Sequence, residues 1–276
     1  MGLKNYSRFF GRGIQHLSYS LEQCSLILSP HLDDVFLSLS ETITAGKLGK
    51  NIIAVNLFSV SDSLVQTNAN LSFNSVARSS VIRMQEEINF SMRLAKKGIN
   101  YIPLFFGVND AAIATYYKFI FSQLAVSNSP KIINSKIRRI CESYALNQSK
   151  KLHIEQMIKP LIMQMGRQIK LVVGPAGIGC HIDHLITKNL LLNSQLFKGK
   201  KKGMFIDIPY AYSHKYTEED MKNNIPMHFK RMTETKFSYS EKLKEFKSIY
   251  PSQYSKNLEK DFKQSKISCT EKIFWS

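Results

Sequence analysis

Apolar residues along the chain form short continuous runs, which alternate with longer segments where they recur every third or fourth position. The short runs are too brief for helices and predict buried strands, whereas the recurring pattern is typical of amphipathic helices. In the first part of the chain we expect a strand at 25–29, a helix from 35 to about 47, a strand at 51–59, a loop at 61–74, a helix at 78–97 and a strand at 100–106.

The same alternation continues after a helical, basic middle segment at about 113–167. There it predicts a strand at 170–173, a helix from 184 to about 196 and a strand at 204–208, then a more polar region from about 216 with a helix at 239–250 and a last strand near Ile267. Strands that alternate with helices indicate an α/β fold with a Rossmann-like, mostly parallel sheet and helices on both faces. We expect residues 1–276 to form one domain, with 1–20 as an N-terminal appendage and 216–276 as a helical C-terminal extension.

The composition excludes two broad classes of protein. Hydrophobic residues make up 43% of the 276 positions, which excludes a wholly disordered chain. No apolar run reaches the roughly 20 residues that a membrane-spanning helix needs. Four widely separated cysteines show no CxxC pairing and are expected to be free thiols in a reducing cytoplasm: Cys24, Cys141, Cys180 and Cys269.

The chain is strongly basic, with 38 Lys and Arg against 21 Asp and Glu and a formal charge of +17. Such a charge attracts phosphates of nucleic acids, nucleotide-sugars or anionic lipids, or it is simply a basic solvated surface. The densest run, Lys198 and Lys200–Lys202, lies between glycines and predicts an exposed loop. It lacks the interleaved aromatic residues of a single-strand binding surface, so no nucleic-acid partner is expected.

The first 20 residues suggest a second location besides the cytoplasm. Their apolar and basic residues fit a short amphipathic helix that contacts an anionic membrane peripherally: Phe9, Phe10, Ile14 and Leu17 with Arg8 and Arg12. The alternative is that this segment packs on the domain or is disordered.

Two short motifs concentrate the residues that carry chemistry. They are HxDD (His31, Asp33, Asp34) and HxDH (His181, Asp183, His184), and each begins near the carboxyl end of a predicted strand and leads into a helix. Open α/β sheets assemble their binding sites at these strand ends, so we expect the two motifs to meet there.

The spacing of these residues predicts a catalytic metal site. His31, Asp34 and His184 would bind one ion and leave an open position, where Zn²⁺ lowers the pKa of a bound water to about 7 and polarises a carbonyl. Asp33 would take the proton of that water, and His181 would donate to the leaving group or stabilise the oxyanion. We expect Asp183 to orient the imidazole of His181.

Other interpretations of these residues stay open. Each histidine alone is compatible with a hydrogen-bonded surface residue, and Asp33 and Asp34 with helix caps. Two histidines and a carboxylate also bind Fe²⁺ in non-haem oxygenases, although the order of the motifs on an α/β pattern argues against that class.

The two motifs resemble those of the PIG-L (LmbE-like) family of zinc-dependent N-acetylglucosamine deacetylases. The resemblance implies metal ligands at His31, Asp34 and His184, a general base at Asp33 and an electrophilic or acidic His181. The substrate that it implies is an N-acetyl amino-sugar conjugate.

Weaker similarities to the family extend over most of the chain. Arg83 and Glu86 resemble an R-x-x-E helix whose Arg contacts substrate, and Asp110 falls where the family has an Asp that binds sugar hydroxyls. Alternatively, Arg83 forms a pair on the helix surface with Glu86 or Glu87, and Asp110 is a turn residue. The segments IDIPYAY (206–212) and YPSQ (250–253) are also similar to family segments.

The chain also departs from the family pattern. Leu32 and Val35 replace frequent Pro and acidic residues, Ile206 replaces a Glu, and Gly179 stands where some members have a Tyr. These departures concern which substrate binds. They do not change the predicted metal site or its chemistry. The sequence therefore predicts a zinc-dependent hydrolase that removes the N-acetyl group from an amino sugar. The alternative is a weak or inactive member that acts as a basic, metal-containing binding protein for phosphorylated or membrane partners.

Overall fold

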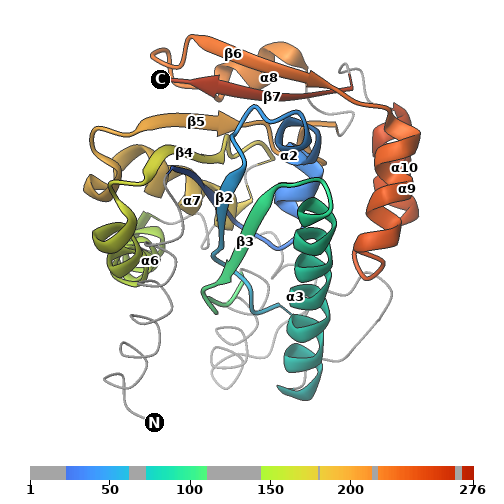
Figure 1. Cartoon of the computed structure of the whole chain (residues 1–276), viewed down its shortest axis with the longest axis horizontal. Coiled ribbons are helices and arrows are strands. Elements are labelled where there is room, and N and C mark those ends of the chain that lie inside the picture. The colour runs from blue at the N-terminus through green and yellow to red at the C-terminus, as the bar shows by residue number, and fades with distance from the viewer. Residues whose placement is uncertain (1–22, 62–72, 111–143, 180, 213–216, 265–268) are drawn as a thin grey trace, which may run out of the picture.

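The computed structural model describes residues 23–61, 73–110, 144–179, 181–212, 217–264 and 269–276. Within these ranges one seven-stranded sheet has the order β3-β2-β1-β4-β5-β7-β6. The first five strands in this order are parallel, and β7 and β6 are antiparallel to their neighbours (Figure 1). The predicted α/β fold with a mostly parallel sheet is confirmed.

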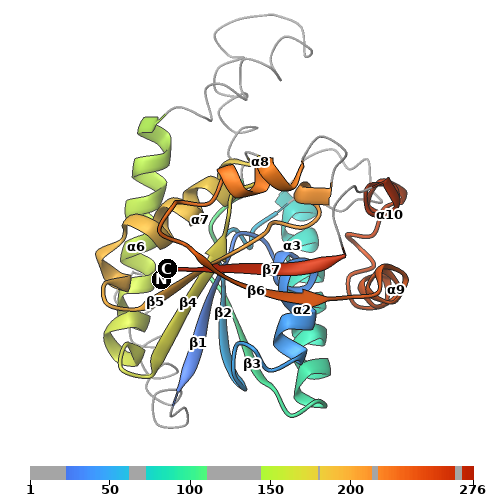
Figure 2. The ribbon, with the colours of Figure 1, turned by 90° about the horizontal axis from the view of Figure 1, so that it is seen from above.

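The parallel strands and the helices that connect them follow the order that the hydrophobic pattern predicts, although the strand predicted at 204–208 lies at 201–205. They are β1 (Cys24–Ser29), α2 (Asp34–Thr44), β2 (Asn51–Asn56), α3 (Phe73–Ala95), β3 (Asn100–Phe105), α6 (Tyr144–Met165), β4 (Ile169–Pro175), α7 (Ile182–Asn193), the 3₁₀ turn η1 (Gln195–Phe197) and β5 (Lys201–Phe205). Figure 2 shows α6 and α7 on one face of the sheet and α2 and α3 on the other. This double cover explains why every residue of β1 is buried, since both faces of the strand pack against helices.

The C-terminal region supplies strands as well as the expected helices. It contains the 3₁₀ turn η2 (Tyr210–Tyr212), α8 (Glu218–Asn223), β6 (Arg231–Lys236), α9 (Tyr239–Ile249), α10 (Lys256–Gln264) and β7 (Thr270–Trp275). The predicted last strand near Ile267 corresponds to β7, which begins at Thr270. A Cβ atom at Gly203 of β5 would lie 2.6 Å from the Trp275 ring, so only glycine lets β7 pack this closely.

A buried ion pair joins the C-terminal elements to the parallel part. Lys242 of α9 contacts Glu271 of β7, and both side chains are fully buried. Glu271 also accepts hydrogen bonds from the backbone N–H groups of Glu41 and Thr42 in α2, at 3.0 and 2.7 Å. A buried charge whose partner is removed is strongly destabilising, so this network makes the C-terminal region integral to the fold.

The prediction of an exposed loop for the basic run Lys198 and Lys200–Lys202 is wrong in part, because Lys201 and Lys202 are the first residues of β5. Lys200 and Lys202 donate to the carbonyl oxygens of Gly166 and Leu192, and Lys201 lies 4.5 Å from the centre of the Trp275 ring. These lysines therefore contribute to packing around β5.

The predictions for residues 1–20, for most of the loop at 61–74 and for 113–143 fall on residues outside the described ranges. Within the described ranges, no helix is both long and apolar enough to cross a membrane. Cys24 and Cys269 are free thiols there, and Cys24 is buried.

Candidate active site

The strand order brings the two motifs together. β1 lies between β2 and β4, and all three strands run in the same direction, so the HxDD turn after β1 and the HxDH turn after β4 leave the same edge of the sheet. In this strand order the chain runs from β1 to β2 and β3 on one side and to β4 and β5 on the other. Crevices at such a switch point are where open α/β sheets bind ligands.

Three atoms from these turns form a nearly equilateral triangle. His31 Nδ1 lies 3.3 Å from Asp34 Oδ2, Asp34 Oδ2 lies 3.3 Å from His184 Nε2, and His184 Nε2 lies 3.3 Å from His31 Nδ1. Tetrahedral Zn²⁺ with N and O ligands at about 2.0–2.1 Å requires its ligand atoms to be about 3.3–3.4 Å apart. The donor set and its spacing therefore fit a divalent metal ion.

Each of the two imidazoles in the triangle has a carboxylate on its other nitrogen. Asp183 Oδ2 lies 3.2 Å from His31 Nε2, and Asp207 Oδ1 lies 2.6 Å from His184 Nδ1. Carboxylates in this position fix the ring orientation and tautomer of metal-binding histidines. The contact of Asp183 with His31 differs from the expected pairing with His181.

The charges of this cluster stabilise one another. Burial acts to lower the pKa of His31, but hydrogen bonds and charge interactions with Asp183 and Asp34 raise it to about 10. Burial likewise acts to lower the pKa of His184, and Asp34 and Asp207 outweigh it. Burial acts to raise the pKa of Asp34, yet the two imidazoles bring it below its usual range. The buried Asp34 carboxylate is therefore ionised, as a metal ligand has to be.

His181 lies beside the triangle. One ligand nitrogen from each of His31, His181 and His184 lies within 4.8 Å of the others, a wider group than the triangle that contains Asp34. The triangle that contains Asp34 is tighter and matches the ligand spacing of Zn²⁺. We therefore place His181 beside the metal site and not among its ligands. Its Nδ1 is buried and has no hydrogen-bond partner among the described residues. Burial and the two neighbouring imidazoles lower the pKa of His181 to about 4.

Asp33 is held by a charged hydrogen bond rather than acting as a helix cap. It occupies the N-cap position of α2, but its side chain makes no capping hydrogen bond. Instead, Arg83 Nη2 donates to Asp33 Oδ1 at 2.9 Å, and Arg83 Nη1 donates to Ser61 Oγ at 2.8 Å. The alternative in which Arg83 pairs with Glu86 or Glu87 on the helix surface is therefore wrong, because Arg83 is only 4% exposed and points into the site.

The acidic residues of α3 bind the YPSQ segment. Ser252 donates through its backbone N–H and its hydroxyl to Glu86, at 2.8 and 2.6 Å. Tyr250 donates to Glu87 at 2.5 Å, and Tyr101 donates to the other oxygen of Glu87. These contacts fix the chain that leads from α9 to α10 against the helix that carries Arg83.

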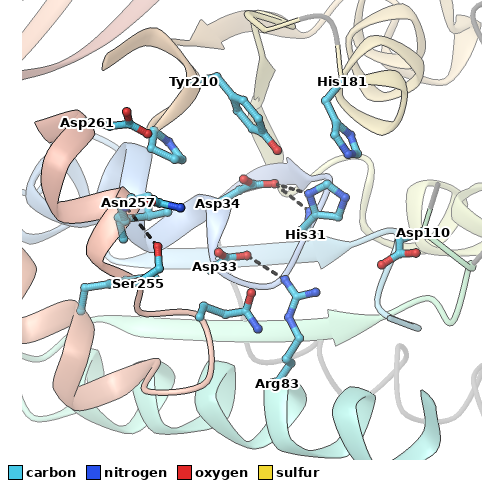
Figure 3. Close-up of a pocket in the computed structure, with 15 residues that line it drawn as sticks. His31, Asp33, Asp34, Arg83, Asp110, His181, Tyr210, Ser255, Asn257 and Asp261 are labelled. Atoms are coloured by element: carbon cyan, nitrogen blue, oxygen red, sulfur yellow. Dashed lines mark hydrogen bonds and ion pairs between the residues drawn. The ribbon is translucent and has the colours of Figure 1, made fainter. Parts of the chain in front are cut away.

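A cavity of about 350 Å³ opens onto this cluster. Six of the predicted site residues line it: His31, Asp33, Asp34, Arg83, Asp110 and His181. Asp183 and His184 lie behind its wall and are fully buried. Figure 3 shows Asp33, Asp34 and His31 at its centre, with Asp110 and His181 to one side. A volume in the range of roughly 300–1,000 Å³ is typical of small-molecule sites.

The sequence analysis gave no role to several residues of the site. Asp207 follows β5, so the strand-end argument used for the two motifs also applies to it. Tyr210 lines the cavity, and its ring lies 5.1 Å from that of His184. A Cβ atom at Gly179 would lie 2.9 Å from Tyr210, so the glycine at that position makes room for this tyrosine. Ser255, Asn257 and Asp261 reach the cavity from α10 and the turn before it.

Comparisons with known proteins identify the fold. No protein-family model matches the chain, and no curated protein matches its sequence. Among solved structures, the chain is similar to the deacetylase of the A40926 pseudoaglycone, with 18% identity, a TM-score of 0.53 and coverage of 92% of this chain and 96% of the other. It is also similar to a triple mutant of a deacetylase in the teicoplanin biosynthetic pathway (18%, 0.56, 92% and 97%). A third similar structure is the zinc-inhibited form of teicoplanin deacetylase (17%, 0.53, 91% and 96%). At this level of identity the likeness shows a shared fold over nearly the whole chain.

Proposed function

We propose that this chain is a metal-dependent N-deacetylase that hydrolyses the acetamide of an N-acetylated amino-sugar conjugate. The reaction forms a C–O bond from water, breaks the C–N bond and releases acetate and a free amine. The observation that carries the proposal is the 3.3 Å triangle of His31 Nδ1, Asp34 Oδ2 and His184 Nε2 at the wall of the cavity. The fold shared with the deacetylases of the A40926 pseudoaglycone and of the teicoplanin biosynthetic pathway supports it, as does the resemblance of the two motifs to the PIG-L (LmbE-like) family.

His31, Asp34 and His184 would hold the metal ion. When bound, a divalent ion supplies an acidified water and polarises the acetyl carbonyl. We propose Zn²⁺, with Fe²⁺ as the alternative. Because the similar teicoplanin deacetylase has a zinc-inhibited form, the metal should be identified in protein purified without added metal.

Asp33 is the proposed general base. Its carboxylate lines the cavity next to Asp34 but lies outside the ligand triangle. Arg83 occupies its Oδ1, which orients the carboxylate and leaves Oδ2 to accept the proton of the attacking water. Because both Nη atoms of Arg83 are engaged by Asp33 and Ser61, we propose that Arg83 acts mainly by orienting Asp33.

Because the pKa of His181 is lowered to about 4, its neutral imidazole is the proposed hydrogen-bond donor to the oxyanion, and Asp33, once it has taken the proton of the water, is the proposed donor to the departing amine. Its Nδ1 makes no hydrogen bond to a described residue, and its side chain lines the cavity beside the ligands. Asp183 and Asp207 position the ligand imidazoles from behind. Asp110, at the side of the cavity, is the proposed acceptor for a sugar hydroxyl.

We further propose a cytoplasmic location, which the free thiols Cys24 and Cys269 support. Peripheral membrane contact through residues 1–20 stays a separate hypothesis. Liposome sedimentation with and without these residues tests it, and equal binding of both proteins would reject it.

The proposed function is tested by acetate release from a panel of N-acetylglucosamine conjugates. We expect activity that a chelator abolishes and that added divalent metal restores. The His184→Ala variant should lose both metal and activity. Absence of acetate release from every conjugate by metal-loaded protein would reject the proposal and favour a binding role.

A further inference from the structure

The charge of the cavity is opposite to that of the whole chain. The protein carries a formal charge of +17. In contrast, four aspartates line the cavity, Asp33, Asp34, Asp110 and Asp261, and Arg83 is the single Lys or Arg among its described lining residues. The net positive charge of the chain therefore does not predict the charge of the ligand that the cavity prefers.

Two of these four carboxylates already have a role at the centre of the site. Asp33 pairs with Arg83 at 2.9 Å, and Asp34 belongs to the ligand triangle. Asp110 and Asp261 remain, and Figure 3 shows them on opposite sides of the central cluster. Asp261 is half-buried, and no hydrogen bond or ion pair joins it to another described residue. Its carboxylate is thus available to a ligand.

The wall around Asp261 has groups that suit an uncharged or amine-bearing sugar. Ser255 and Asn257 provide a hydroxyl and an amide, and Tyr210 and Leu258 provide apolar surface. Hydroxyl and amide groups exchange hydrogen bonds with sugar hydroxyls, and apolar side chains cover the faces of sugar rings.

This wall is held firmly in place. Ser255 Oγ accepts a hydrogen bond from the N–H of Leu258 at 3.0 Å, and the hydroxyl of Tyr239 donates to the carbonyl of Glu259 at 3.2 Å. The Phe262 ring packs edge-on against Tyr212, with 5.1 Å between centres. The side chains of α10 that face the cavity are therefore preorganised for a ligand.

We propose that the wall formed by Ser255, Asn257 and Asp261 is the subsite for the unit joined to the N-acetyl sugar. It selects an uncharged or amine-bearing sugar and discriminates against units that carry a phosphate or carboxylate. An anionic group next to Asp261 would be repelled and would lose its hydration without gaining a cationic partner, whereas an ammonium group would form an ion pair. This inference rests on the proposed function and narrows its substrate.

Three matched disaccharides test the subsite. Each has N-acetylglucosamine joined to a second sugar with the same pyranose ring, which is glucosamine (an ammonium at C2), glucose (uncharged) or glucuronic acid (a carboxylate at C6). We expect kcat/KM to fall in that order, with about three- to tenfold per step, as for partly exposed charge pairs. The ionic strength should be fixed near 0.15 M, because the exterior charge would otherwise attract the anionic substrate.

The Asp261→Asn variant should make the three kcat/KM values equal to within about twofold, by lowering that of the glucosamine disaccharide and raising that of the glucuronic acid disaccharide towards that of the glucose disaccharide. The matched control is Glu259→Gln, which removes one negative charge from the same helix at a side chain that contacts Lys263 and Tyr254. This control should keep the wild-type order.

The outcomes separate the two proposals. If wild-type protein deacetylates none of the three disaccharides, nor simpler N-acetylglucosamine conjugates, the proposed function fails. If it deacetylates all three with equal kcat/KM, or prefers the glucuronic acid compound, the subsite inference is overturned while the function stands. An equal loss for all three substrates in Asp261→Asn would also overturn the inference, because it would show a purely structural role.

Discussion

The Asp207→Asn variant tests whether the second carboxylate prepares His184 for a metal ion. Asp207 uses both of its oxygens, because Oδ1 contacts His184 Nδ1 at 2.6 Å and Oδ2 accepts from the N–H of Ile178 at 3.0 Å. Both Asp207 and His184 are fully buried. An amide has only one oxygen, so the variant has to give up one of these contacts.

Both arrangements of the introduced amide are unfavourable. If its oxygen faces His184, the N–H of Ile178 meets an NH₂ group and loses its partner, at a cost of about 1–3 kcal/mol. If its NH₂ group faces His184, Nδ1 has to accept and the proton moves to Nε2, the atom that belongs to the ligand triangle. We therefore expect metal affinity to fall about 10- to 100-fold, which corresponds to about 1.4–2.7 kcal/mol.

The assay is competition for metal with a chromogenic chelator at pH 7.5, together with urea unfolding of the metal-free protein. Asp110→Asn is the matched control, since Asp110 is buried in the same site and lies outside the ligand triangle and its two supporting carboxylates. We expect its metal affinity to equal that of the wild type. A metal affinity of Asp207→Asn within twofold of the wild type would refute the assignment of His184 Nε2 as a ligand supported through Nδ1.

Three further variants test other parts of the site. Asp33→Asn should retain metal but lose about 10²- to 10⁴-fold in kcat, because the amide cannot take a proton, as measured by acetate release and metal content. Gly179→Ala should lower stability by about 1–2 kcal/mol, because its φ is +86°, and should also lower kcat/KM at least tenfold, because its Cβ displaces Tyr210. Burial raises the pKa of Glu87 from 4.5 to about 7 against the hydrogen bonds from Tyr101 and Tyr250. As the pH rises, Glu87 therefore loses its proton in the unfolded state before it does so in the folded state. The free energy of unfolding that protonated Glu87 contributes is lost between pH 4.5 and 7, by up to about 3 kcal/mol. Glu87→Gln should remove this dependence in urea unfolding at pH 5 and pH 7.5.

Each of these variants has a control or a contradictory outcome. Gly46→Ala has a similar positive φ of +70° but no atom within 4 Å of the new Cβ, so it should lose stability and keep activity. If Gly46→Ala and Gly179→Ala lose activity equally, backbone strain rather than Tyr210 is responsible. Undiminished turnover of Asp33→Asn would show that another group is the base. An unchanged pH dependence in Glu87→Gln would contradict the role of that carboxyl in stability.

The parts of the fold that the sequence predicted are those with a strong local pattern. Apolar runs such as 25–29, and helices with a regular apolar face, form because these residues are buried against neighbouring elements. The apolar pattern that indicates this burial can be read from each segment alone. Strand β6 was missed because five of its six residues, all except Met232, are charged or hydroxylated, as suits a strand at the edge of a sheet. Its pairing with β7 depends on residues distant in the sequence.

The site was predicted where chemistry and strand ends coincide. His31, Asp34 and His184 meet in the structure because β1 and β4 are adjacent, which the alternation of strands and helices allowed us to expect. Asp207 was missed because the predicted strand ran to 208, whereas β5 ends at Phe205 and leaves Asp207 in the turn that faces His184. Asp261 gave no signal at all, since nothing in the periodicity of α10 shows that this helix folds over the cavity.

The position of β7 in the sheet has a consequence for biosynthesis. This strand comes after every other element in the chain, yet it lies between β5 and β6 and carries Glu271, the buried partner of Lys242. Protein synthesis proceeds from the N-terminus, and contacts between distant segments close slowly. While residues 270–275 are still being translated, β6 has no partner and Lys242 is an unneutralised charge, so the nascent chain exposes an open sheet edge that invites aggregation or chaperone binding.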